Sequence, residues 1–152
     1  MLYALLKTLH LLSVILWVGG MLFAHFFLRP SLVVLDPPAR PRLMQAVLGR
    51  FFAAVLAASL LVVATGALMW ALNPPLAVPL GWSVMAVAGS AMLVIFLAIR
   101  FLLYPRLRRA LGAGDATGTA AALAGIRRWV GVNLVLGLAI VVVLRLGPAV
   151  LN

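Results

Sequence analysis

The chain has 152 residues, of which 66% are hydrophobic and 9% are charged, and its formal net charge is +10. A soluble domain of this size cannot bury so much apolar surface, so the composition predicts a protein surrounded by lipid. The absence of cysteine excludes disulfides, thiolate metal sites and cysteine nucleophiles. The length suits one domain over residues 1–152.

Four apolar segments are long enough to cross a bilayer as helices. They cover residues 2–28, 51–72, 82–104 and 129–151. We therefore expect an all-α fold, a four-helix transmembrane bundle embedded in the lipid bilayer. The first segment lacks a basic leader and is longer than a signal-peptide core, so we expect it to be retained as a helix.

The positions of the basic residues predict the orientation of the bundle. Ten of the twelve lie on the side of the first and third connections, nine in the connections themselves and Arg100 near the end of the third segment, and none lies in the second connection, residues 73–81. Because cytoplasmic loops are rich in arginine and lysine, we expect both basic loops in the cytoplasm and both termini outside. This pattern fits a bacterial inner-membrane protein with periplasmic termini. It also explains the positive charge without a nucleic-acid partner.

Two further patterns concern the connections. The Gly/Ala/Thr-rich residues 111–125 predict a flexible connection in the third loop, with room for a short interfacial helix. The first and third segments end in similar sequences, FFLRPSL at 26–32 and FLLYPRL at 101–107. Such a repeat is typical of two parallel helix hairpins, and chance similarity between apolar helices is the alternative.

His10 and His25 are the only histidines, and both lie in the first segment. At a rise of about 1.5 Å per residue they lie roughly 20 Å apart, so they cannot share a metal within one chain. Met69 and Met85 are expected near the depth of His10, and thioether with imidazole suits Cu(I). Ordinary apolar packing is the alternative for both methionines. The pair Met21 and His25, four residues apart on one helix face, is a secondary metal candidate.

The same His10 with a methionine also suits a low-spin haem b. In this alternative Lys7 and Arg145, which lie on the outer side with His10, would neutralise the haem propionates. Snorkelling of both cations to lipid headgroups is the other explanation. No catalytic triad, nucleotide loop or pair of carboxylates is present in the sequence. We therefore expect a non-enzymatic protein or, failing that, a haem-dependent membrane oxidoreductase.

Several motifs resemble those of the copper-resistance D-type (CopD-like) bacterial inner-membrane proteins. The resemblance rests on LHL at 9–11, WVGGM at 17–21, RP at 29–30, GRF at 49–51, TG at 65–66, RW at 128–129 and Asn133. It implies a copper-handling protein that binds or translocates copper, with a periplasmic copper protein as partner. Together with the residues above, it predicts a His/Met copper site near the periplasmic side.

A more distant similarity is to HemJ-type protoporphyrinogen oxidases, whose early histidine matches His10. Those proteins also carry a histidine and a lysine at the start of the third span, where this chain has GWSVMA at 81–86. This departure counts against haem-dependent protoporphyrinogen oxidation.

A helper subunit that packs against another membrane protein is a third hypothesis. Because four short spans enclose little interior, we expect a homodimer or a larger assembly.

Overall fold

The computed structural model describes residues 1–74 and 80–150, and these form long helices joined by short turns. The first half contains α1 (Leu2–Phe23), the π-helical turn η1 (Ala24–Leu28), α2 (Arg29–Ser31), the 3₁₀ turn η2 (Leu32–Val34) and α3 (Ala39–Leu72). The second half contains α4 (Leu80–Ala98), the π-helical turn η3 (Ile99–Leu103), α5 (Tyr104–Gly112) and α6 (Ala116–Val150). No strand occurs in the two described ranges, which confirms the all-α prediction.

Four helical units are long and apolar enough to cross a membrane, which confirms the predicted transmembrane bundle. They are Leu2–Val34, Ala39–Leu72, Leu80–Gly112 and Ala116–Leu144. A unit of 33 residues is about 50 Å long, whereas the hydrocarbon core of a bilayer is about 30 Å thick. The helices therefore continue past the predicted spans. Residues 75–79 of the uncharged second connection, and residue 151 of the fourth predicted span, lie outside the described part.

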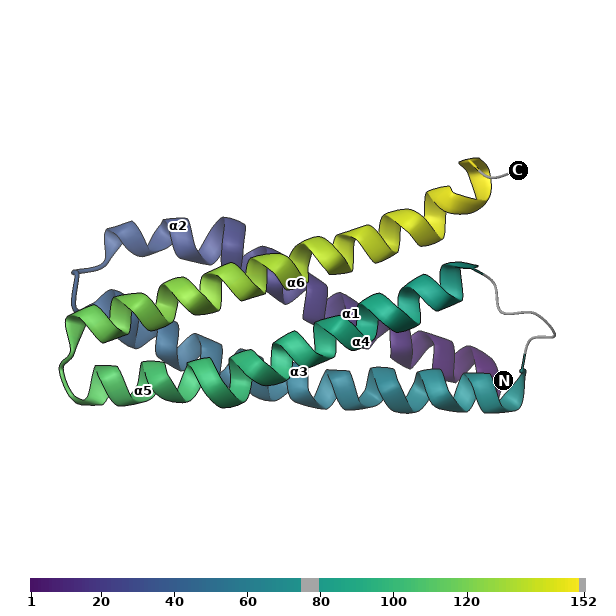
Figure 1. Ribbon diagram of the computed structural model, residues 1–152, viewed down its shortest axis with the longest axis horizontal. Helices are drawn as coiled ribbons and strands as arrows, with labels where there is room; N and C mark the ends of the chain where they lie inside the picture. Colours follow the sequence, from purple (N-terminus) through teal and green to yellow (C-terminus); the bar gives the residue numbers. More distant parts are fainter. Residues whose placement is uncertain (75–79, 151–152) are drawn as a thin grey trace.

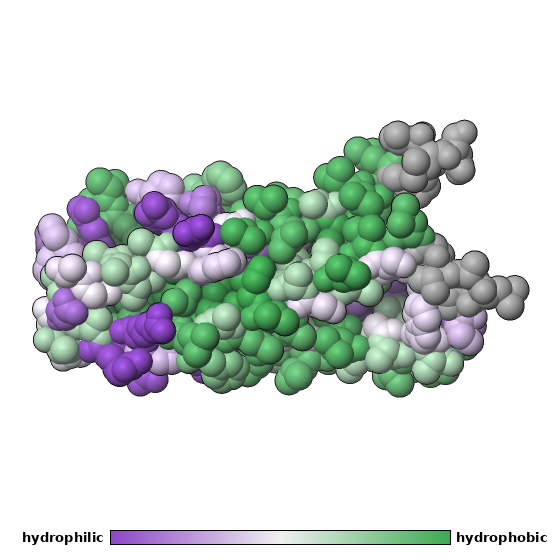
Figure 2. Space-filling view, in the orientation of Figure 1, coloured by the Kyte–Doolittle hydropathy of each residue, from purple (hydrophilic) through white to green (hydrophobic). Residues whose placement is uncertain are grey.

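The four units lie side by side, with both termini at one end of the molecule (Figure 1). α2, α5 and the first turns of α3 and α6 lie at the other end. α1 packs along α3, while α6 packs along α4 and α5, so the chain forms two helix hairpins. Hydrophilic residues gather at the end opposite the termini, and the middle of the visible surface is hydrophobic (Figure 2). The arginine-rich loops therefore share one end of the bundle, which we call the basic end.

The two π-helical turns occupy matching places in the two hairpins. Each precedes a proline, Pro30 after η1 and Pro105 after η3. A proline has no N–H, and its ring clashes with the carbonyl four residues earlier. The wider turn accommodates both effects, and the backbone N–H of Arg29 and of Tyr104 bonds to the carbonyl five residues back. The sequence repeat at 26–32 and 101–107 thus has a structural counterpart.

The predicted flexibility of residues 111–125 is wrong. Only residues 113–115 interrupt the helices, and α6 begins at Ala116. Gly114 has a positive φ of 69°, which lets the chain reverse direction. The carboxylate of Asp115 accepts a hydrogen bond of 2.8 Å from the N–H of Gly118, so it caps the first turn of α6. The Ala-rich sequence after this cap favours helix over loop.

Aromatic rings and one hydrogen bond between helices hold the middle of the bundle together. The ring of Phe96 meets the rings of Trp17 and Phe52 edge to face, at centroid distances of 5.6 and 6.1 Å. The side-chain amide of Asn133, only 1% exposed, donates a hydrogen bond of 3.1 Å to the carbonyl of Met92. This bond joins α6 to α4. A polar side chain in an apolar bundle needs such a partner across helices.

Candidate metal centre at His10

His10 lies in α1 and is held against α3 by a hydrogen bond. Its Nδ1 lies 3.0 Å from Oγ1 of Thr65, a residue that is 3% exposed. The two residues are 55 positions apart in the sequence, so the bond ties the first two spans together. The imidazole itself is half-buried.

The partners of Thr65 determine which nitrogen of His10 carries the proton. The Thr65 hydroxyl donates to the carbonyl of Leu61 at 2.6 Å, with the carbonyl of Val62 at 3.2 Å. A hydroxyl has one hydrogen to donate, and we assign it to the shorter contact with Leu61, so that Oγ1 acts as the acceptor toward His10. The Nδ1 of His10 is therefore the N–H donor. In the neutral ring Nε2 then keeps a free lone pair, as a metal-binding histidine requires.

The α3 face beside His10 is open because of a glycine. A Cβ placed on Gly66 would meet Cε1 of His10 at 3.7 Å, so the imidazole lies directly over the backbone of this residue. Met69 follows Gly66 by three residues and Thr65 by four, and it therefore shares their helix face. It is half-buried. The first predicted partner of His10 thus lies on the same side of α3, one turn closer to the termini.

Met85 lies on α4, which begins beside the end of α3. The rings of Trp70 and Trp82 are 6.1 Å apart, and Met85 follows Trp82 by three residues. This ring contact joins the end of α3 to the start of α4, and within the described residues it is not accompanied by a contact of Met85 with His10. Within the described ranges, no three His, Cys, Asp or Glu side chains gather into a possible metal site. A site at His10 would therefore depend on thioethers or on ligands from another chain.

Of the two cations of the haem alternative, only Lys7 has a described side chain. Lys7 is exposed and precedes His10 by three residues on α1. Arg145 belongs to α6, and its side chain lies outside the described part of the structure. The exposure of Lys7 is compatible with either expectation, contact with a lipid headgroup or with a haem propionate.

The two residues of the secondary metal candidate, Met21 and His25, lie in different surroundings, one in the core and one at the surface. Met21 is 2% exposed and packs into the central hydrophobic cluster. His25 instead faces α6 beside Arg127, at the basic end. The neighbouring positive charge disfavours a metal cation there. The pair Met21 and His25 stays a prediction without support from its surroundings.

Thr65 is the residue of this site that the sequence interpretation did not assign. The signal was available, because Thr65 is the last polar residue before the end of an uncharged span, seven residues before Leu72. His10 lies eight residues after the start of the preceding span. Equal distances from the same end of two antiparallel helices place the two side chains at one depth. A polar pair in lipid is then expected to form a hydrogen bond.

The fold and this pairing define a four-span integral membrane protein with one histidine held between its first two spans. The family model of copper resistance protein D matches residues 45–146, about two thirds of the chain. The chain belongs to this family, and it is a multi-pass membrane protein of a copper-resistance family. No curated protein and no solved structure matches it. The matched range includes Thr65, Met69 and Met85 but not His10, and it gives no support to the haem alternative.

Proposed function

We propose that the protein handles copper by binding Cu(I) at Nε2 of His10, near the end of the bundle that carries the termini. The observation that supports this most strongly is the hydrogen bond from His10 to Thr65. It fixes the tautomer that leaves Nε2 unprotonated and orients the ring. Copper is here the cargo of the protein, and the histidine is its first point of attachment.

The methionines supply the soft ligands that favour Cu(I) over harder cations. Met69 is the better supported, because it shares the α3 face on which the imidazole rests. Met85 completes the set if the ends of α3 and α4 stay together as the contact of Trp70 with Trp82 indicates. We infer a His/Met/Met set in which imidazole and thioethers bind the ion without a negatively charged side chain.

The finer aspects of the assignment are also proposals. We place the termini and His10 on the periplasmic side of a bacterial inner membrane, because the basic end is expected in the cytoplasm. A periplasmic copper protein would then deliver or accept the ion at His10. A homodimer would supply the interior that one thin bundle lacks, and crosslinking in native membranes that shows only monomers would contradict it.

The direct test is an anaerobic Cu(I) titration of the purified protein against a chromophoric chelator. We expect one Cu(I) per chain, and at least a hundredfold weaker binding in His10→Ala because the anchoring ligand is lost. His25→Ala is the matched control, since it removes the other histidine of the same helix, and its affinity should equal that of the wild type. Met69→Leu preserves the volume and should weaken binding about tenfold. Unchanged binding in His10→Ala would overturn the proposal.

A further inference from the structure

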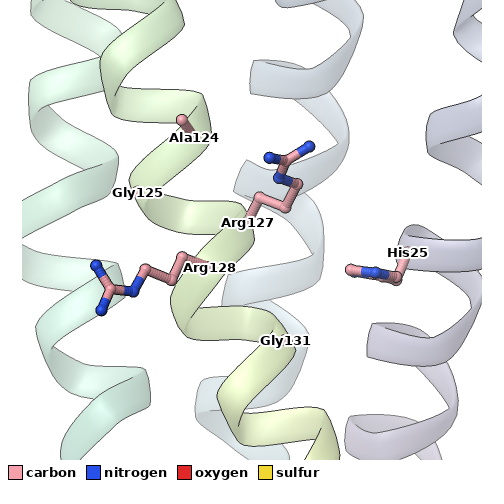
Figure 3. Close-up of a pocket in the computed structure, with 6 residues that line it drawn as sticks. All are labelled: His25, Ala124, Gly125, Arg127, Arg128 and Gly131. Carbon is pink, nitrogen blue, oxygen red and sulfur yellow. The ribbon is translucent and has the colours of Figure 1, made fainter.

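A groove at the basic end separates η1 from α6 and has a volume of about 590 Å³ (Figure 3). It lies about fifteen residues along the first span from His10, and the proposed copper site does not include it. Five of its six lining residues belong to α6. The lining consists of His25, Ala124, Gly125, Arg127, Arg128 and Gly131.

The small residues of α6 keep the groove open. In Figure 3 the imidazole of His25 points from its own helix toward α6. A Cβ built on Gly131 would lie 4.0 Å from Cε1 of His25, so only the glycine backbone forms the floor beneath the ring. Ala124 and Gly125 provide a similarly shallow surface one to two turns away. A ligand group in the groove can therefore approach the α6 backbone closely.

The two arginines of the groove extend in different directions. The side chain of Arg127 extends on the side of α6 that faces His25, whereas that of Arg128 extends to the opposite side (Figure 3). The guanidinium of Arg128 lies over the ring of Trp129, 6.0 Å from its centroid. Arg127 and His25 are thus the groups available to a ligand between the helices.

The positive charge of the groove is not balanced by the chain itself. Arg29, one turn beyond His25, lies close enough to Arg127 for their charges to repel. The whole chain has only two carboxylates for twelve basic residues. One of them, Asp115, is the cap of α6. An anion between Arg127 and Arg29 would remove the repulsion.

We propose that this groove binds the phosphate group of an anionic ligand. The guanidinium of Arg127 would donate two parallel hydrogen bonds to the phosphate oxygens, and a ring N–H of His25 would donate a third. Phe26 and Phe27, which follow His25, are 59% and 58% exposed. An acyl chain attached to the phosphate can lie along them. A phospholipid headgroup and a free phosphate share this chemistry, and binding measurements separate the two.

The test is native mass spectrometry of the detergent-purified, delipidated protein with three probes. These are dihexanoyl phosphatidylglycerol, dihexanoyl glycerol without the phosphate, and inorganic phosphate. We expect one phosphatidylglycerol per chain and no binding of the phosphate-free lipid. Arg127→Gln should weaken phosphatidylglycerol binding about fivefold to tenfold, because one cation near a membrane surface contributes on that scale. Binding of inorganic phosphate alone, with the same dependence on Arg127, would support the phosphate site and identify free phosphate as the ligand.

Two further variants separate the groove from the general charge of the basic end. Arg106→Gln removes an exposed arginine of the same end outside the groove, and it should change binding less than twofold. Gly131→Leu fills the groove without changing the charge, and it should weaken binding as strongly as Arg127→Gln. The proposal is overturned if neither phosphate compound binds, or if Arg106→Gln and Arg127→Gln have equal effects.

Discussion

The two histidines of α1 and η1 are the same residue type in one continuous helix, yet their surroundings differ at every point. His10 lies within hydrogen-bond distance of the buried hydroxyl of Thr65 and has a glycine surface beside its ring. His25 faces a groove with Arg127, and Arg29 is close by. The first environment leaves a neutral nitrogen lone pair free for a soft cation. The second attracts anions.

This difference shows that the binding properties of a histidine in a membrane helix depend on the residues that the neighbouring helix places beside it. At the end of the bundle that carries the termini, α3 places beside His10 the hydroxyl of Thr65, which donates its own proton to the carbonyl of Leu61. At the basic end α6 presents glycines and an arginine. Two histidines about 20 Å apart on one helix can therefore differ in function, one as a metal ligand and one as an anion-binding group, although no carboxylate lies beside either of them in the described structure.

We expect the largest effect on the difference between the two histidines when the hydroxyl that orients His10 is removed. Thr65→Val keeps the shape of the side chain but leaves Nδ1 without its acceptor, so the ring can turn and change tautomer. We expect Cu(I) affinity to fall by about tenfold to a hundredfold, as for other residues that orient metal ligands. Chelator competition measures the change. Thr65→Ser retains the hydroxyl and should bind within about threefold of the wild type, and equal losses in both variants would refute the role of the hydrogen bond.

The packing in the middle of the bundle, between His10 and His25, is sensitive to added volume at Gly137. A Cβ there would already approach Val18 at 2.9 Å and Met92 at 3.2 Å. We expect Gly137→Leu to lower the free energy of unfolding by about 1–3 kcal/mol through overpacking. Thermal unfolding in detergent measures this loss. Gly89→Leu is the control, because a Cβ on Gly89 meets nothing within 4 Å. A loss of the same size at Gly89 would contradict the packing argument.

A smaller effect is expected at Asn133, whose amide bonds to the carbonyl of Met92 while its own Oδ1 has no hydrogen-bond partner among the described residues. Asn133→Leu removes the bond and also the buried, unpaired oxygen, so the two changes oppose each other. We expect unfolding free energy to change by less than about 1 kcal/mol, near the usual strength of such bonds in membranes. A loss above about 2 kcal/mol in the unfolding assay would show that the bond contributes more than a typical one.

The smallest expected effect is the coupling between the two ends. His10 and Arg127 lie far apart and share no neighbours, so their substitutions should act independently. In the double variant His10→Ala/Arg127→Gln, each binding loss should match that of the single variant within about twofold. Parallel Cu(I) and phosphatidylglycerol measurements test this. A larger deviation would mean that the two sites communicate through α1.

Much of the fold follows from sequence patterns, because apolar length alone specifies helices in lipid. The arginine positions also anticipated the gathering of charge at one end. Residues 111–125 were misjudged because glycine and threonine suggest a loop, whereas one cap at Asp115 is sufficient to begin a long helix. The groove at His25 was not anticipated, since it depends on which face of α6 turns toward η1. That rotation is set by tertiary packing.

The π-helical turn η3 has a consequence for changes in chain length. Along α4 and α5 the buried residues Met92, Phe96 and Ile99 follow ordinary helical spacing, but the next one, Tyr104, comes five residues later. The wide turn absorbs one surplus residue, so Tyr104 still faces the interior. Deleting a residue within Ile99–Leu103 would return this stretch to ordinary helix, with a kink at Pro105, and keep the inner face aligned. The same deletion within α4 would rotate everything after it by about 100°. Loss of a single residue is therefore expected to be better tolerated at η3 than within α4.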